Sequence, residues 1–396
     1  MRLVMVSVSA STQLSGVSRH VANLARCLLL YTDVEAIHLI AAPWERALFR
    51  DAVALEDPRL HIHSVYVGTA TLARNMWFWA DLPSIAEQLH ADIVHLGYPA
   101  PLRRRRFPCP AVVSVHDLYP WDIPENWGFP KVFFNRMVFG QCVRAADALA
   151  CVSDATLSRL REKAPVKLGK KAQRIYNCVD PGKVRVGRSP LLPSFSAPFF
   201  LCVAQHRRNK NLLLALRTLV RLLREKAVHP DTLLVVVGIP GPETAAIHEF
   251  IEEAGIGTNV LFLSGISEAE LQWCYRNCEV LLAPSLVEGF GLPVAEALLA
   301  GCRVVCSDIP PFRELGGNHC RYFSPGPNAQ EDFAAAIRFA LAGPRSAPVA
   351  LPQLSGKLIA AEYMALYRAL ADGRCSLPAV PQPAGFAPAK GVVMKG

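Results

Sequence analysis

Two carboxylates flank a glycine-rich turn in the carboxyl-terminal half of the chain. Glu288 and Glu296 are separated by seven residues, and the turn between them begins Gly289-Phe290-Gly291-Leu292-Pro293. An apolar run typical of a strand precedes the turn, and Pro293 suits the first turn of a helix. Glycine lets the backbone approach a ligand, and the N–H groups at a helix start favour an anion. Those groups belong to Phe290, Gly291 and Leu292. Because a carboxylate repels phosphate, the two acids are expected to accept protons from sugar or ribose hydroxyls.

This segment resembles the signature of the family-4 glycosyltransferases, enzymes of the two-lobed GT-B fold that move a sugar from a nucleotide diphosphate donor. The resemblance spans about residues 1–370 and is stronger in the second half. It implies that Glu288 contacts hydroxyls of the donor sugar and that Glu296 contacts the nucleotide ribose. It also implies that the amides of Phe290 to Leu292 hold the diphosphate. An ordinary loop and helix start with surface acids is the alternative interpretation.

A basic loop follows the first strand expected in the second half, with the sequence Arg207-Arg-Asn-Lys210-Asn. It resembles the family's loop in which an arginine and a lysine clamp the donor diphosphate. Two fixed cations there would offset the charge that develops on the leaving group. Lys210 aligns through its Lys-Asn pair, and Arg207 is the chosen arginine, with Arg208 and His206 as alternatives. Without the resemblance, the segment would be interpreted as a solvated basic turn.

Three further landmarks match the family in the expected order. Gly16 would let the loop after the first expected strand approach the donor phosphate or sugar, although Ser15 stands where a second glycine is common. His116 ends a strand, where doubly wound folds place ligands, and would touch the donor sugar near its reacting carbon. A histidine that only caps the strand end is the alternative, and Asp117 is of the type that often bonds the loop backbone. Backbone atoms of Ile266 would contact the nucleotide base.

The chain contains no Asp-x-Asp triplet, the usual carboxylate cage for a divalent metal on a diphosphate. We therefore expect no metal and no other cofactor, with Arg207, Lys210 and the helix amides balancing the diphosphate charge. Family members retain the anomeric configuration of the sugar. Because transfer passes through an oxocarbenium-like state and no carboxylate is clearly placed as a nucleophile, we expect same-face attack by the acceptor, assisted by the departing phosphate.

Two other classes of function stay open at this point. A nucleotide-sugar epimerase or a glycogen phosphorylase would share the architecture. The epimerase needs further acid–base groups that the sequence does not identify, and the phosphorylase needs a pyridoxal-binding lysine and usually a longer chain. The second alternative is a non-catalytic basic binding protein, against which the intact Glu288, Glu296 and Lys210 count.

Short apolar runs alternate with helical patterns in both halves of the chain. The main helices are expected at 17–30 and 211–225, and the expected strands are 3–8, 36–41, 61–67, 92–96, 111–115 and 148–152 in the first half and 199–204, 233–238, 260–263, 280–283 and 303–307 in the second. Such alternation predicts an α/β chain with two Rossmann-like doubly wound domains, which the resemblance implies face each other across a cleft.

The expected domain organisation follows from where this alternation stops and restarts. An amino-terminal, acceptor-side domain covers 1–180, and a linker with four prolines and no helical period covers 181–198. The nucleotide-sugar domain covers 199–353, and a final helix at 354–372 crosses back toward the first domain by resemblance. Residues 373–396 are rich in proline, alanine and glycine without periodicity, which predicts a disordered tail.

Composition favours a globular protein, whereas the basic charge by itself does not choose among nucleic acid, anionic lipid and an anionic small molecule as a partner. Hydrophobic residues make up 52% of the chain, charged residues 19%, and the net charge is +9. The run Arg103 to Arg106 is the only dense basic segment, and a solvated loop is its first interpretation. A membrane-surface patch is the alternative, and nucleic acid is not expected as a partner.

Several features predict a cytoplasmic location, with peripheral contact at the inner membrane face as an alternative. The 12 cysteines show no zinc-ligand spacing and several lie in apolar runs, which is typical of reduced, buried thiols. The run at 3–8 is interpreted as a buried strand rather than a signal peptide. No stretch of about 18 uncharged apolar residues occurs, so no membrane span is expected.

The acceptor is expected to be a saccharide or a lipid-linked saccharide in cell-surface polysaccharide or glycolipid synthesis, by resemblance. A group of aromatic residues follows His116, in and around a proline-containing stretch. It consists of Trp121, Trp127, Phe129, Phe133 and Phe134. Core packing of a loop and a helix is the first interpretation of this group. The alternative is contact with an apolar acceptor or a membrane.

Overall fold

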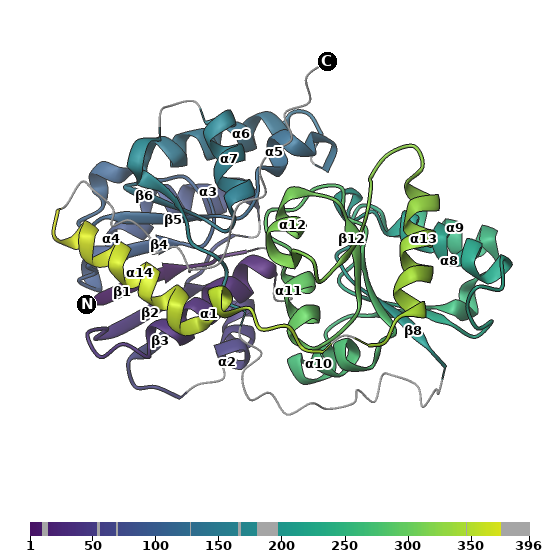
Figure 1. Ribbon diagram of the computed structural model, residues 1–396. Helices are drawn as coiled ribbons and strands as arrows, with labels where there is room; N and C mark the ends of the chain where they lie inside the picture. The colour runs from purple at the N-terminus through teal and green to yellow at the C-terminus, as the bar shows by residue number, and fades with distance from the viewer. Residues whose placement is uncertain are drawn as a thin grey trace, which may run out of the picture.

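The computed structural model describes residues 1–9, 15–53, 56–68, 70–126, 128–164, 168–179, 197–345 and 347–373. Two parallel β-sheets, each with helices on both faces, form an amino-terminal and a carboxyl-terminal lobe that lie side by side (Figure 1). Most of the predicted linker at 181–198 and all but the first residue of the predicted tail at 373–396 lie outside the described residues, as does Trp127.

The amino-terminal lobe is built on one parallel sheet with strand order β3-β2-β1-β4-β5-β6-β7. Its strands are β1 (Arg2–Val6), β2 (Ala36–Ala41), β3 (Leu60–Ser64), β4 (Ile93–Leu96), β5 (Ala111–Val115), β6 (Ala148–Cys151) and β7 (Ala172–Arg174). The central strands are buried along their whole length and are apolar except at His95 and Ser114, as expected for a parallel sheet that is covered on both faces.

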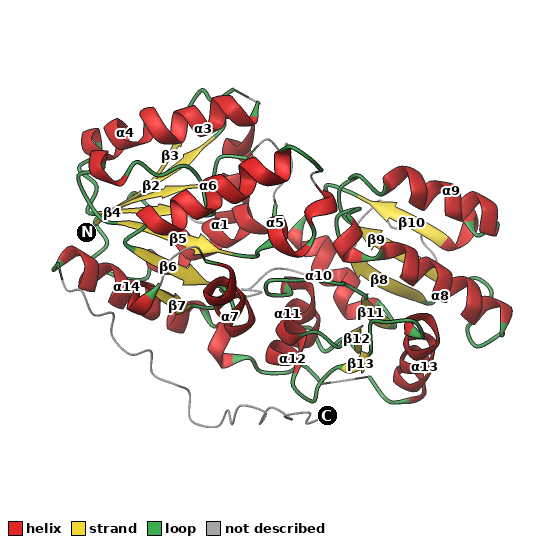
Figure 2. Cartoon of the chain, turned by 90° about the horizontal axis from the view of Figure 1, so that it is seen from above, coloured by secondary structure: helices red, strands yellow, loops and turns green. Residues whose placement is uncertain are grey.

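Helices cover both faces of this first sheet. They are α1 (Gly16–Leu28), α2 (Arg46–Val53), α3 (Thr71–Ala80), α4 (Leu82–Gln88), α5 (Tyr119–Asp122), α6 (Lys131–Ala145) and α7 (Asp154–Lys163). The α3, α4 and α6 helices bury side chains in the core on one face, whereas α1 and α2 pack on the other (Figure 2). The Ser153 hydroxyl accepts a hydrogen bond from the Thr156 amide and so caps the amino terminus of α7.

The carboxyl-terminal lobe repeats the plan on a sheet with strand order β10-β9-β8-β11-β12-β13. Its strands are β8 (Phe199–Val203), β9 (Leu233–Val237), β10 (Val260–Leu263), β11 (Val280–Ala283), β12 (Val304–Ser307) and β13 (Arg321–Phe323). Its helices are α8 (Leu212–Arg224), α9 (Thr244–Ala254), α10 (Glu268–Asn277), α11 (Leu292–Leu299), α12 (Pro310–Gly316) and α13 (Ala329–Ala342). The α10, α11 and α12 helices cover one face of the sheet, and α8, α9 and α13 cover the other.

The predicted fold class of two Rossmann-like domains is confirmed. Each strand predicted from an apolar run is present, with ends that differ by at most three residues. The sequence analysis missed β7 and β13, which have three residues each. A three-residue strand is too short to produce a recognisable periodicity.

Strand order reverses direction at β1 in the first sheet and at β8 in the second. In doubly wound sheets, ligands bind beyond the carboxyl ends of the strands near such a reversal. The loops that carry Gly16, Arg207 and Lys210 follow β1 and β8, and those that carry His116 and Glu288 follow β5 and β11. The topology therefore gathers the predicted site residues where the two lobes face each other.

The last helix, α14 (Gly356–Ala371), follows the carboxyl-terminal lobe in sequence but packs on the amino-terminal lobe beside α1 (Figure 1). Its residues Ile359, Tyr363 and Met364 are fully buried in the core on that face of the first sheet. The Tyr363 hydroxyl lies 3.3 Å from the Ser114 hydroxyl of β5. The amino-terminal elements β1 and α1 and the last helix, α14, therefore share one core in the amino-terminal lobe.

In the part of the chain that the structure describes, no helix is both long enough and apolar enough to span a bilayer.

Replacing Tyr363 tests how strongly α14 is docked. Tyr363→Ala should lower the free energy of unfolding by about 3–5 kcal/mol, because it leaves a cavity in the core. Tyr363→Phe removes only the hydroxyl and should cost about 1 kcal/mol. Urea unfolding followed by circular dichroism measures both, with the exposed Leu30→Ala as a control that should stay near the wild type. An unchanged Tyr363→Ala variant would show that α14 contributes little.

Candidate active site

A charge pair lies at the carboxyl ends of the adjacent strands β8 and β11. The Lys210 ammonium is 2.5 Å from one oxygen of Glu288, and the Ser285 hydroxyl donates to the same oxygen at 2.7 Å. All three residues line a small hollow between these strand ends. Lys210 and Glu288 are both predicted site residues. They lie 78 positions apart in sequence and are in direct contact in the structure.

Tyr119 reaches this pair from the other lobe. Its hydroxyl donates to the second oxygen of Glu288 at 3.4 Å and accepts a hydrogen bond from the Asn209 side chain at 3.1 Å. Burial, and then the nearby Glu288, raise the pKa of Tyr119 well above its usual value, so the hydroxyl keeps its proton. The sequence analysis missed Tyr119 and Asn209. Their only signals were closeness in sequence to His116 and to Lys210.

His116 is held by a backbone carbonyl. Its Nε2 lies 3.0 Å from the Gly97 oxygen, and because a carbonyl only accepts, Nε2 carries the hydrogen. Burial lowers the pKa of His116 to about 4, which keeps the ring neutral near pH 7. The unprotonated Nδ1 can then accept a hydrogen bond, for example from a sugar hydroxyl. The ring also contacts His20 edge-on, with centroids 4.9 Å apart.

Asp117 and the basic loop face each other across the same space. The Asp117 carboxylate accepts a hydrogen bond from the Tyr119 amide at 3.1 Å, the loop-backbone contact expected of such a residue. Burial raises the pKa of Asp117 to about 6, and this backbone hydrogen bond, Lys210 and Arg207 oppose the rise. Arg207 is partly buried within electrostatic reach of Asp117, whereas Arg208 is exposed to solvent. This placement favours Arg207 as the inward-facing arginine.

Glu296 lies in a different environment from Glu288. Its carboxylate accepts a hydrogen bond from the Tyr275 hydroxyl at 2.7 Å and one from Arg19 at 3.4 Å. Arg19 belongs to α1 of the other lobe and also pairs with Glu268 at 3.0 Å. Burial raises the pKa of Glu296, and Arg19 opposes the rise. The sequence analysis assigned no role to Arg19 or Tyr275, and nothing in the sequence marks Tyr275.

The glycine-rich turn forms the start of α11. Gly291 is the N-cap with φ of 105°, a value that favours glycine, and Leu292 begins the helix. The Phe290 side chain is buried in the core, so only its backbone is available to a ligand. Gly16 of the other lobe lies so close that a Cβ there would be 3.9 Å from Leu292. Ile266 lies in the loop before α10 and packs against the same core.

Among the described residues, no group of three or more histidine, cysteine, aspartate or glutamate side chains is arranged to hold a metal ion. The cysteines of those residues are buried, and none of them forms a disulfide.

Two family models match the chain, one on each lobe. Residues 14–183 match the model described as Glycosyltransferase Family 4, and residues 192–350 match the model described as Glycosyl transferases group 1. The chain belongs to the family-4 glycosyltransferases of the GT-B fold.

Sequence relatives and solved structures support the family and the fold of this glycosyltransferase. The O-antigen chain mannosyltransferase RfbU of Salmonella typhimurium is 25% identical over 214 residues, which are 54% of this chain and about half (56%) of that relative. Sucrose-phosphate synthase from Thermosynechococcus elongatus superposes with a TM-score of 0.69 at 16% identity, over 94% of this chain and 100% of that one. The Anabaena protein HepE, in complex with UDP and glucose, gives 0.64 at 16% identity, over 95% and 96%.

At Gly289 the backbones of the two lobes of the glycosyltransferase lie in direct contact. A Cβ on Gly289 would lie 1.5 Å from the His116 carbonyl oxygen, so a side chain cannot fit. The Gly289 carbonyl accepts hydrogen bonds from the hydroxyls of Ser153 at 2.6 Å and Thr156 at 2.9 Å, both in the amino-terminal lobe. The sequence predicts that a glycine here lets the backbone approach a ligand. In the structure, the group that lies against Gly289 is the backbone of the opposite lobe.

Gly289→Ala should therefore force the lobes apart while each lobe stays folded. We expect a larger radius of gyration by small-angle X-ray scattering and about a hundredfold lower turnover of any donor that the wild type uses, because the groups of the two lobes no longer align. Gly257→Ala is the matched control, since a Cβ there has no neighbour within 4 Å. A Gly289→Ala scattering curve identical to that of the wild type would contradict this account of the contact.

Proposed function

We propose that this chain is a retaining hexosyltransferase. It moves a hexosyl group from a nucleotide diphosphate sugar to a hydroxyl of a saccharide or lipid-linked saccharide. The observation that carries the proposal is the Lys210–Glu288 pair, which sits beside the start of α11 at the ends of β8 and β11. A cation, a carboxylate and a helix amino terminus match the three parts of such a donor: diphosphate charge, sugar hydroxyls and phosphate oxygens.

The charged groups have separate roles in this proposal. Lys210 and Arg207 offset the charge that grows on the diphosphate as the glycosidic bond breaks, and the amides of Phe290, Gly291 and Leu292 bind its oxygens. Glu288 accepts hydrogen bonds from hydroxyls of the donor sugar. The hydrogen bond from the Lys210 ammonium orients the Glu288 carboxylate before the donor arrives.

The remaining predicted residues complete the donor site. His116, neutral and held by Gly97, contacts the donor sugar through its free acceptor nitrogen. Glu296 accepts hydrogen bonds from the ribose hydroxyls, and the hydrogen bond from Tyr275 fixes the orientation of its carboxylate. The backbone of Ile266 contacts the base, and Gly16 lets the first loop approach the phosphate or the sugar.

The reaction proceeds by same-face attack. The acceptor oxygen approaches the face from which the diphosphate leaves, and the departing phosphate takes the acceptor proton. The new bond therefore has the configuration of the old one. The protein supplies leaving-group stabilisation rather than a nucleophile, as the cationic loop and the helix start allow.

We place the reaction in the synthesis of a cell-surface polysaccharide or glycolipid, because RfbU, a relative, is named for the O-antigen chain. We place the chain in the cytoplasm, at the inner face of the membrane. Its buried cysteines without disulfides suit a reducing compartment.

Assay of purified chain with a panel of nucleotide diphosphate sugars and oligosaccharide acceptors tests the proposal. We expect glycosylated acceptor and free nucleoside diphosphate at the same rate with and without EDTA, because protein cations take the place of a metal. Activity that EDTA abolishes and Mg²⁺ or Mn²⁺ restores would reject only the metal independence. An isomerised sugar formed from donor alone would instead identify an epimerase, and binding of nucleic acid without any donor would identify a basic binding protein.

The two glutamates should separate in kinetics. Glu288→Gln should lower kcat by about 10- to 100-fold, because sugar contacts near the reacting carbon strengthen in the transition state. Glu296→Gln should mainly raise KM and weaken the free nucleoside diphosphate, because ribose contacts are equal in both states. Calorimetry and steady-state rates measure these effects, with the exposed Glu249→Gln as control. The opposite pattern would reverse the two assignments.

A further inference from the structure

The α6 helix has an apolar face that points to solvent. Phe139, Cys142 and Val143 fill the core on its inner face, as expected for a helix that covers a sheet. Its outer face is also apolar, because Phe133, Phe134 and Met137 are exposed there, and Phe129 just before the helix is 89% exposed. The first interpretation of these phenylalanines as core residues was wrong, although Trp121 does pack against the core. A surface helix of a globular protein is normally polar on its outer face.

The α3 helix shows the same feature. Leu72, Met76 and Trp79 are spaced four and three residues apart, which places them on one face of the helix. All three are exposed, Leu72 to 75%. On the opposite face, Trp77 and Phe78 are buried in the same core that α6 covers.

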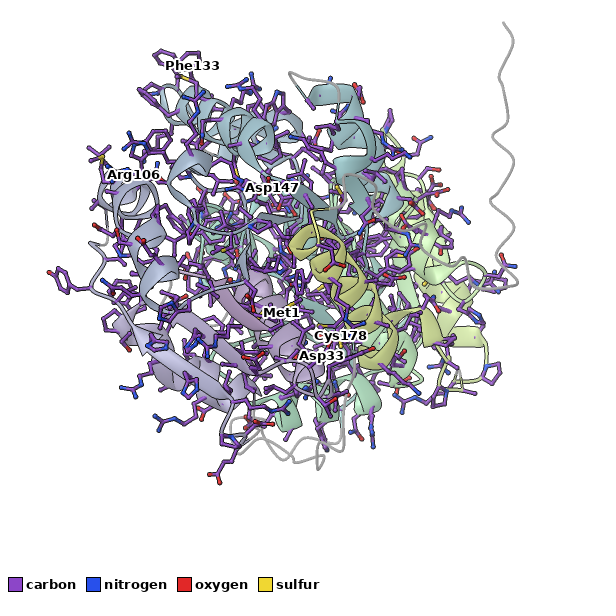
Figure 3. The ribbon with its side chains drawn as sticks, turned by 90° about the vertical axis from the view of Figure 1, so that its left-hand side faces the viewer. Met1, Asp33, Arg106, Phe133, Asp147 and Cys178 are labelled. Atoms are coloured by element: carbon purple, nitrogen blue, oxygen red, sulfur yellow. The ribbon has the colours of Figure 1, made fainter. Side chains whose placement is uncertain are left out.

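The loop with the basic run connects these two apolar faces. The Leu102 backbone exchanges hydrogen bonds of 3.0 and 2.7 Å with the Gln141 side chain of α6, and the Arg103 guanidinium lies 5.7 Å from the ring centre of Trp79 in α3. Phe133 and Arg106 lie along the same outer edge of the amino-terminal lobe (Figure 3). The α3–α6 surface consists of Leu72, Met76, Trp79, Arg103, Arg105, Arg106, Phe129, Phe133, Phe134 and Met137.

The charge of the α3–α6 surface is of one sign. Neither α3 nor α6 contains an acidic residue, and the side chains of Arg103, Arg105 and Arg106 are exposed. Arg104 is paired with Asp147 and is left out of the surface for that reason. Exposed apolar side chains beside unopposed cations are typical of segments that lie in a bilayer interface, with the apolar groups at the acyl boundary and the cations near lipid phosphates.

We propose that the α3–α6 surface docks this protein on an anionic lipid bilayer. A second copy of the chain fits the surface less well, because a two-fold contact would bring its arginines against one another. A bilayer offers negative charge over its whole area. The proposal therefore identifies the partner as anionic phospholipid, and it does not depend on the transfer reaction.

The position of the surface also bears on the proposed acceptor, a step that does rest on the proposed function. In α6, Arg136 donates a hydrogen bond of 2.8 Å to the Pro120 carbonyl, next to Tyr119, whose hydroxyl bonds Glu288. The amino-terminal end of α6 is thus one short helix away from the candidate active site. Docking by this surface would place the lipid headgroups at the edge of that site, where an acceptor with a lipid anchor can present its hydroxyl.

Sedimentation of the full chain with phospholipid vesicles tests the docking. We expect the wild type to bind vesicles of phosphatidylcholine with added phosphatidylglycerol more tightly than vesicles of phosphatidylcholine alone, and less tightly as salt rises. Arg105→Glu with Arg106→Glu should weaken binding to the anionic vesicles at least about 25-fold, at roughly fivefold for each arginine. Phe133→Ser, Phe134→Ser and Met137→Ser together should weaken binding to both kinds of vesicle about tenfold or more.

Matched substitutions on the carboxyl-terminal lobe serve as controls. Phe339 is 59% exposed, as Phe134 is, so Phe339→Ser is the matched control for a single Phe134→Ser variant, which is measured beside the triple variant. Arg224→Glu with Arg276→Glu reverses two exposed charges. Both controls should bind vesicles as the wild type does, and thermal melts should show that every variant is folded.

Three results would overturn the proposal: a wild type that stays in the supernatant, controls that lose as much binding as the test variants, or test variants that dissociate a dimer in ultracentrifugation while still binding vesicles. Donor turnover in vesicle-free buffer is measured alongside. A wild type that binds vesicles but uses no nucleotide sugar would reject the proposed function and leave the docking intact.

Discussion

The backbone contact between Gly289 and His116 is the constraint on which the rest of the site depends. No side chain fits between these two peptides, and two hydroxyls of the amino-terminal lobe donate to the Gly289 carbonyl. The loop that follows β11 and the loop that follows β5 are therefore held side by side. Glu288 is next to Gly289 in sequence, and Asp117 is next to His116. The carboxylates of the two lobes therefore come close only because no side chain separates the two backbones.

Electrostatics within the site follows from the burial that this contact creates. Removal from water lowers the pKa of His116 to about 4 and raises that of Asp117 to about 6. The ring is then neutral and able to accept a hydrogen bond, whereas Glu288 has Lys210 as its direct partner. A site with one paired carboxylate, one neutral imidazole and a nearby arginine suits a polyanionic donor whose leaving group gains charge.

The two lobes are not independent units, because α14 returns to the first sheet after the second lobe is complete. The α14 helix lies beside α1 (Figure 1). Its tyrosines fill the core there, and α1 carries Arg19, which pairs with Glu296. The outer side of the same amino-terminal lobe bears the α3–α6 surface. The lobe thus faces the candidate active site on one side, is covered by α14 on a second, and exposes apolar and cationic side chains on a third.

The sequence by itself determined the strands, the doubly wound class and the position of Glu288, Lys210 and His116, because each depends on local order: an apolar run, a glycine-rich turn or a residue at a strand end. Only the tertiary structure decided that Tyr119 and Arg19 reach carboxylates 169 and 277 positions away. It also decided that Gly289 meets a backbone and that Phe133 faces solvent. Periodicity shows which faces of an element are apolar, but it does not show which of them another element will cover, since that depends on contacts between residues far apart in the chain.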